Sequence, residues 1–181
     1  MASHGWDRAV TAAFSHLALT VAKVEPMAKF YGEVFDMEAS PHVFEGHGHR
    51  LSRVMEVPEA KIRGLFMRRD GLLLELLEYQ SAHRASPGPR DDDEIGYAHL
   101  SFVVDDLERT GRRIDAAGGE YRVASRADFV FEGGATTSMA FCLDPEGNRI
   151  ELVHHHEATS RTAHARFLGV ENLAWLAGSG I

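Results

Sequence analysis

The sequence predicts an α+β fold built from two similar halves. The segment Ser-His-Leu-Ala-Leu-Thr-Val (residues 15–21) is echoed by Ala-His-Leu-Ser-Phe-Val-Val (residues 98–104), and a helical pattern follows each. Each half then closes on a strand that carries a glutamate among aliphatic residues, as Leu-Glu-Leu-Leu (74–77) and Ile-Glu-Leu-Val (150–153). Such self-similarity indicates an internal repeat. Each half is therefore expected to contain a strand, a helix and two or three further strands.

In the first half, hydrophobic spacing separates strand from helix. Residues 14–21 alternate as a strand, and Glu25-Pro26 suits the first turn of a helix, where proline is tolerated. Apolar side chains at helical spacing continue that helix to Phe35. Alternation and turn residues assign the rest: a short strand at 38–44, a loop at 45–49, and a hairpin of strands 61–68 and 72–79 turned at 69–71.

The second half is organised around the turn Asp-Pro-Glu-Gly-Asn at residues 144–148. Proline presets φ, and glycine and asparagine tolerate left-handed geometry, so the flanking strands 136–143 and 149–155 form a hairpin. Upstream, the sequence predicts a strand at 97–104, a helix capped by Asp105-Asp106 and ended by Gly118-Gly119, a strand at 120–125 and a loop at 126–134.

The polar run between the halves marks the best internal boundary. Residues 81–96 contain several turn-formers followed by Asp-Asp-Asp-Glu, which is typical of a linker. The expected organisation is a first module at 14–80, this linker at 81–96, a second module at 97–156 and a C-terminal extension at 157–181.

Composition narrows the class of protein. Hydrophobic residues make up 44% and charged residues 25% of the 181 residues, which is ordinary for a soluble domain. The net charge of −8 argues against nucleic acid or an anionic membrane as partner, and no apolar run is long enough to span a membrane. The single cysteine, Cys142, excludes an intrachain disulfide and is expected in the core, so a cytoplasmic location is the default.

The chemistry of the chain centres on Glu151. Alternation places this carboxylate in a strand that lines the interior, where an unpaired charge is costly. The repeat supplies compensation, because His16, Glu75 and His99 occupy matching places in the two halves. Four N/O ligands meeting in one cleft would bind one divalent metal ion, and Ni, Co, Zn, Mn and Fe all accept such ligands. The alternative is a buried His/Glu polar network without metal.

At these motifs the chain resembles the glyoxalase, or vicinal-oxygen-chelate, superfamily over about residues 14–156. The carriers are His16, Glu75 in Leu-Glu-Leu-Leu-Glu-Tyr, His99 in Tyr-Ala-His-Leu-Ser-Phe, and Glu151 after Asp-Pro-Glu-Gly-Asn. The resemblance implies paired βαβββ modules that form a curved mixed sheet around a metal-containing cleft, with ligands at these four positions. It is nearest to glyoxalase I and methylmalonyl-CoA epimerase-like members. A homodimer is expected, and the superfamily builds its cleft either within one chain or across two.

Three functions compete. The first is metal-assisted proton transfer next to a carbonyl of a small molecule, by a lyase or isomerase, with Glu75 and Glu151 as catalytic carboxylates. The second is extradiol ring cleavage on Fe(II), for which His16, His99 and Glu151 would form the two-His-one-carboxylate triad. Glu75 argues against it, since a fourth ligand fills a position that oxygen needs. The third is a sequestering module of the bleomycin-resistance kind, against which the complete ligand set weighs.

Candidate substrate-binding residues are less sharply defined. Arg63 and Arg149 are guanidinium groups that suit a substrate carboxylate. His155 is expected to share the face of Glu151, since strand side chains alternate. Glu78 falls on the face opposite Glu75 and is expected to be a charge at the rim.

Overall fold

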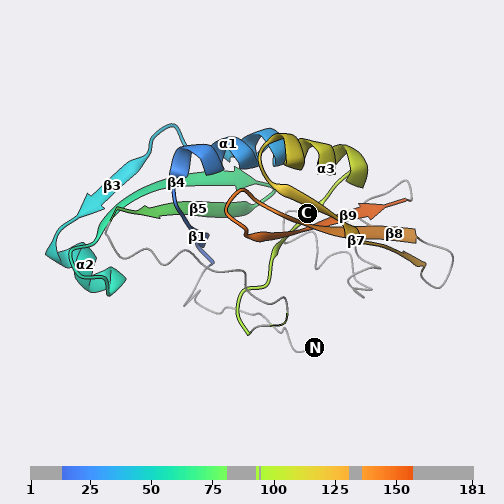
Figure 1. The fold of residues 1–181 in the computed structure, drawn as a ribbon. Coiled ribbons are helices and arrows are strands. Elements are labelled where there is room, and N and C mark those ends of the chain that lie inside the picture. Colours follow the sequence, from blue (N-terminus) through green and yellow to red (C-terminus); the bar gives the residue numbers. More distant parts are fainter. Residues whose placement is uncertain (1–13, 81–92, 94, 131–135, 157–181) are drawn as a thin grey trace, which may run out of the picture.

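The computed structural model describes residues 14–80, 93, 95–130 and 136–156. Two sheets lie side by side, and helices α1 (Val24–Phe35) and α3 (Leu107–Ala116) cover the same face of the pair (Figure 1). The linker at 81–96 and the extension at 157–181 fall largely or wholly outside the described residues. None of the described helices has the length and apolar character needed to cross a lipid bilayer.

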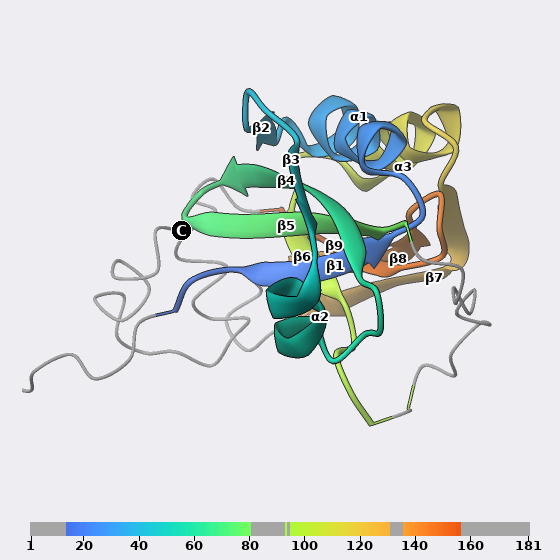
Figure 2. The ribbon, with the colours of Figure 1, turned by 90° about the vertical axis from the view of Figure 1, so that its left-hand side faces the viewer.

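Each sheet has the same plan. Sheet 1 has the order β1 (Leu17–Val21), β5 (Leu72–Tyr79), β4 (Lys61–Arg69) and β2 (Glu38–Ala39), with β3 (Phe44–His47) also paired to β4 (Figure 2). Sheet 2 has the order β6 (Leu100–Val103), β9 (Arg149–His155), β8 (Thr136–Leu143) and β7 (Glu120–Val130). The first strand of each half is parallel to the last strand, and the other pairings are antiparallel. This confirms the predicted α+β fold of paired βαβββ units, with two sheets in place of one.

Several predicted boundaries were wrong. The loop expected at 45–49 is instead the end of β3 followed by helix α2 (His49–Met55). Phe44 of β3 packs on Gly64 of β4, and a Cβ atom added to Gly64 would lie only 2.0 Å from the phenylalanine ring. The glycine therefore makes room for this strand pairing. Strand β7 continues to Val130 through a shift of register after Arg122, where a loop was expected from residue 126. Pairing between distant segments decided both cases.

One hydrophobic core spans both halves. The apolar face of α1 is buried throughout, including Met27, Phe30 and Val34. At the C-terminal end of this helix, Phe35 stacks on Phe102 of β6 with ring centroids 4.0 Å apart. Cys142 is fully buried, as predicted, and burial together with the nearby Asp144 and Asp115 raises the pKa of its thiol to about 12. The halves are therefore held together by packing against α1.

The turn at residues 144–148 also joins the two halves. Tyr31 of α1 donates its hydroxyl to Asp144 Oδ2 at 3.0 Å, and burial followed by the charge of Asp144 raises the tyrosine pKa well above its usual value. Asp144 also accepts the backbone N–H groups of Glu146 and Asn148 at 2.9 and 2.8 Å. The backbone N–H of Ala22 in turn donates to both carboxylate oxygens of Glu146, at 2.9 and 2.7 Å. The predicted turn is thus an anchor between the halves.

Candidate metal centre

A histidine and a glutamate meet on the open face of sheet 1, the face away from the helices. His16 Nε2 lies 3.1 Å from Glu75 Oε2. His16 directly precedes β1, and parallel pairing sets Ala18 opposite Glu75, so the imidazole reaches the carboxylate from the strand end. The prediction placed this histidine on the strand, whereas the strand begins one residue later. The carboxylate side chain is 14% exposed and the imidazole 35%.

Sheet 2 repeats this arrangement with one addition. His99 Nε2 lies 3.7 Å from Glu151 Oε2, and His99 also directly precedes its strand, β6. Here Ser101 is the residue opposite Glu151, and its hydroxyl donates to Glu151 Oε2 at 2.7 Å. The sequence repeat therefore gives the two halves the same donor pair at the same place.

Two phenylalanines that were not predicted from the sequence lie beside the histidine–glutamate pairs. Phe66 is opposite Glu75 in the β4–β5 register, and Phe141 is opposite Glu151 in the β8–β9 register. Each ring meets the neighbouring histidine edge-on, with centroids 5.5 Å apart for His16 and 5.4 Å apart for His99. The position of a turn fixes the register of its hairpin, so counting residues back from each predicted turn would have placed these phenylalanines opposite the two glutamates.

The structure brings the four predicted ligands together as two pairs. Among the described residues, no group of three or more His, Cys, Asp or Glu side chains is close enough to hold one metal ion. Each pair nevertheless fits half of a metal site. Two ligand atoms about 2.1 Å from one ion stand about 3.4 Å apart at the tetrahedral angle, close to the 3.1 and 3.7 Å observed. Together the pairs offer two imidazole nitrogens and two carboxylates.

The three candidate substrate-binding residues do not all lie on the same face of the sheets. Arg149 and His155 share the face of Glu151 on sheet 2, the face away from the helices. The guanidinium of Arg149 lies over the Phe141 ring, 3.8 Å from its centroid. His155 is buried, and its Nδ1 lies 2.9 Å from Thr137 Oγ1.

Arg63 does not join this site. It is opposite Glu78 in the register, on the face that meets α1, and it makes ion pairs with Glu25, Glu45 and Glu78. The carboxylate of Glu25 and the other two raise the pKa of Arg63 above its usual value. These contacts argue against the predicted role in binding substrate.

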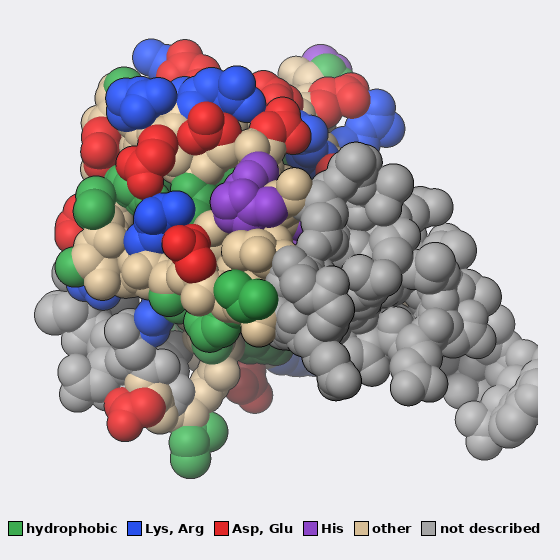
Figure 3. Space-filling view, turned by 90° about the vertical axis from the view of Figure 1, so that its right-hand side faces the viewer, with side chains coloured by type: hydrophobic (Ala, Val, Ile, Leu, Met, Phe, Trp, Pro, Cys, Tyr) green, Lys and Arg blue, Asp and Glu red, His purple; other side chains and the backbone are tan. Residues whose placement is uncertain are grey.

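His154 of β9 and His156, which follows this strand, point away from the candidate centre. His154 Nδ1 lies 3.0 Å from the backbone oxygen of Val104, and His156 Nε2 lies 2.6 Å from Ser138 Oγ. Their ring centroids are 4.6 Å apart. Their register with Ser138 places them on the opposite face from Glu151. Figure 3 shows histidine side chains gathered on one face of the molecule.

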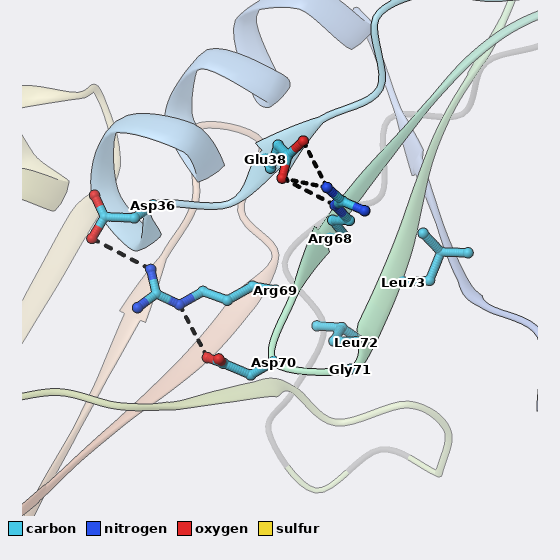
Figure 4. A pocket seen from close by; sticks show the side chains of 8 residues that line it. All are labelled: Asp36, Glu38, Arg68, Arg69, Asp70, Gly71, Leu72 and Leu73. Atoms are coloured by element: carbon cyan, nitrogen blue, oxygen red, sulfur yellow. Dashed lines mark hydrogen bonds and ion pairs between the residues drawn. The ribbon is translucent and has the colours of Figure 1, made fainter. Parts of the chain in front are cut away.

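A depression of about 640 Å³ lies at the β4–β5 turn rather than at either histidine–glutamate pair. Its charged side chains engage one another: Arg68 with Glu38, and Arg69 with Asp36 and Asp70 (Figure 4). Arg69 also donates to the backbone oxygen of Phe35 at the end of α1. These contacts tie the turn to the helix, which is a structural role.

Known proteins resemble this chain in sequence. The family model described as Glyoxalase/Bleomycin resistance protein/Dioxygenase superfamily matches residues 13–152. Lactoylglutathione lyase of Schizosaccharomyces pombe is 27% identical over 161 residues, covering 84% of this chain and 51% of that enzyme. The chain thus spans about half the length of this relative. The probable lactoylglutathione lyase of Vibrio parahaemolyticus is 28% identical over 149 residues, covering 80% of this chain and 92% of that protein.

A solved structure supports the fold. The glyoxalase family protein from Bacillus cereus superposes with a TM-score of 0.65 at 17% identity, covering 78% of this chain and 93% of that one. At this identity the likeness concerns the fold alone. The family model spans most of the chain and the fold agrees with it, so the chain belongs to the glyoxalase/bleomycin resistance protein/dioxygenase superfamily.

Proposed function

We propose that this chain is a metal-dependent lyase of the glyoxalase type, which moves a proton next to the carbonyl of a small-molecule substrate. The observation that carries the proposal is the duplicated histidine–glutamate pair, 3.1 Å apart in one half and 3.7 Å in the other. Relatives named lactoylglutathione lyase support the reaction class. The first substrate to test is the hemithioacetal of methylglyoxal and glutathione.

We further propose that the site is completed by a second copy of the chain. One face offers a single imidazole and a single carboxylate, and the described part of one chain holds no group of three ligands. A two-fold axis that sets sheet 1 of one copy against sheet 2 of the other brings the four donors together. It does so twice, so a dimer has two equal sites.

Each of the four predicted ligands then has a role in this proposal. His16 and His99 supply neutral nitrogen ligands, and Glu75 and Glu151 supply carboxylates. A bound divalent ion supplies Lewis acidity toward the substrate carbonyl. A carboxylate in this position accepts the proton from the carbon beside the carbonyl and returns it to the neighbouring carbon. The conversion is a net isomerisation of the hemithioacetal into the thioester.

Arg149 is the proposed anchor for a negatively charged group of the substrate. Its guanidinium lies on the open face, two residues from Glu151, and the Phe141 ring supports it at 3.8 Å. Stacking on an aromatic ring fixes the plane of a guanidinium while its edge still donates hydrogen bonds. His155 lies farther along the same face and is the proposed second polar contact.

Metal analysis of protein purified without chelator or nickel resin tests the proposal. We expect about one divalent ion per chain, and loss of that ion in both His16→Ala and Glu151→Gln. A protein that takes up no metal on titration would overturn the lyase proposal and favour a sequestering module. Iron with catechol cleavage would instead favour the extradiol reaction.

Mixing two variants tests the shared site. His16→Ala and His99→Ala are each expected to be inactive, because every site of either homodimer lacks one ligand. After dissociation and random reassociation, half of the dimers are mixed, and each mixed dimer holds one intact site. About a quarter of wild-type activity should return. If the mixture stays inactive while wild type survives the same treatment, the site lies within one chain.

A further inference from the structure

Beside each histidine–glutamate pair, here called a half-site, one serine contacts a proposed ligand. The serine contacts the histidine in the first half and the glutamate in the second. In the first half, Ser15 Oγ lies 2.9 Å from His16 Nδ1. In the second half, Ser101 Oγ donates to Glu151 Oε2 at 2.7 Å. At the equivalent positions of the repeat the chain has alanine: Ala98 precedes His99, and Ala18 is opposite Glu75.

The first contact leaves the metal-facing atom of its ligand available, and the second adds a donor to the carboxylate oxygen nearest His99. His16 turns Nε2 toward Glu75, so its Nδ1 is the nitrogen that meets Ser15. A histidine that ligates through Nε2 carries its proton on Nδ1, and a hydrogen bond there fixes tautomer and ring orientation. Ser15 accepts that proton. The single hydroxyl proton of Ser101 must go to Glu151, because a carboxylate offers only acceptors.

The second contact accompanies the wider separation of histidine and glutamate in sheet 2. Ser101 and His99 approach the same oxygen, Glu151 Oε2, at 2.7 and 3.7 Å. In sheet 1 the alanine leaves Glu75 Oε2 to His16, and the distance is 3.1 Å. The hydroxyl of Ser101 occupies one acceptor site of Glu151 Oε2, and the oxygen keeps a second lone pair for a metal ion. This hydrogen bond leaves Glu151 with a fixed carboxylate and Glu75 with a freer one.

We propose that Ser15 and Ser101 are positioning residues of the metal centre, Ser15 for His16 and Ser101 for Glu151. The four ligands are then inequivalent: one histidine and one glutamate, from different halves, are held by hydroxyl groups. This inference rests on the proposed metal site. It predicts that the two serines contribute separately to metal affinity, because they hold different ligands.

Zinc titration of the full-length chain in competition with a fluorescent chelator tests the proposal. Ser15→Ala and Ser101→Ala should each weaken zinc binding about 10-fold, the usual size of an outer-shell contribution. Both positions are exposed, so thermal unfolding of the metal-free protein should stay as in wild type. The conservative variants Ser15→Thr and Ser101→Thr keep the hydroxyl and should bind zinc as wild type does.

The outcomes separate this inference from the proposed function. If His16→Ala and Glu151→Gln lose zinc but both serine variants keep wild-type affinity, the serines have no positioning role and the metal site stands. Weakened binding that threonine does not restore would also overturn the inference, since a packing effect would then explain the loss. If wild type binds no zinc, both the metal site and the role of the serines are wrong.

Discussion

Two glutamates of β5, three residues apart, have opposite surroundings. Glu75 lies on the open face, part-exposed, with His16 at 3.1 Å. Glu78 lies on the helix face and is fully buried. It accepts from Lys23 Nζ at 2.7 Å, from the backbone N–H of Val24 at 3.2 Å and from Arg63 Nη1 at 3.3 Å.

The difference separates a carboxylate that stabilises the fold from one that is proposed as a metal ligand. Glu78 was expected at the rim, but it is buried because α1 begins directly above it and presents a backbone N–H group. Burial alone would raise the pKa of Glu78, but the hydrogen bonds from Lys23 and Val24 and the charges of Lys23 and Arg63 lower it overall. Glu75 contacts only the imidazole of His16 among the ion pairs of the described residues and is part-exposed, which suits a ligand that binds an incoming cation.

The largest expected effect is on metal affinity, when Glu75 on the face away from the helices is changed. Glu75→Gln should lower metal affinity by at least about 100-fold, because an amide is a far weaker ligand than a carboxylate. The free energy of unfolding of the metal-free protein should be unchanged, since no buried ion pair is broken. Zinc titration and urea denaturation measure the two quantities. A large loss of stability with metal binding intact would reverse the roles assigned to the two glutamates.

The matching change on the helix face should have the opposite result. Glu78→Gln should lower the free energy of unfolding by about 2 kcal/mol, because Lys23 and Arg63 lose their buried partner. Metal affinity should remain within about twofold of wild type, since Glu78 points away from the ligands. Glu45→Gln is the control: Glu45 is exposed and lies 3.6 Å from Arg63, and such surface pairs contribute about 0–1 kcal/mol.

Stability as a function of pH sharpens the same comparison. The folded-state pKa of Glu78 lies below the ordinary value of 4.5, so its contribution is complete above about pH 4.5 and disappears as pH falls through the lower, folded-state value. The difference in unfolding free energy between wild type and Glu78→Gln should therefore be constant near neutrality and shrink in acid. A difference that grew on acidification would mean that burial, not ion pairing, dominates.

The smallest predicted effect concerns the aromatic wall of the first half-site. Phe66→Leu removes the ring whose edge meets His16, and should weaken zinc binding about threefold, since such ring pairs contribute about 0.5–1.5 kcal/mol. Phe44→Leu is the control, because Phe44 stacks on Phe66 with centroids 5.7 Å apart, one ring farther out. Equal losses in the two variants would indicate that general packing, and not contact with the imidazole, is responsible.

Local signals in the sequence were sufficient for the plan of the fold and for the histidine and glutamate of each half. The repeat placed one histidine and one glutamate in each half and predicted that all four meet in one cleft, whereas within one chain they lie as two pairs. The spacing of apolar residues closely predicted the first and last residues of α1, because the buried face of this helix is continuous. Alternation along the predicted strand gave the shared face of Arg149, Glu151 and His155.

Other features depend on which distant segments meet, and the sequence gives no local sign of these contacts. Strand β3 exists because it pairs with β4, and Arg63 belongs to the helix face because Glu78 and Glu25 lie there.

The sequence by itself determined the two halves and their helices α1 and α3, since these follow from periodicity and turn chemistry. Tertiary structure alone decided that the four predicted ligands lie as two pairs, because that depends on how the two sheets pack beside each other around α1.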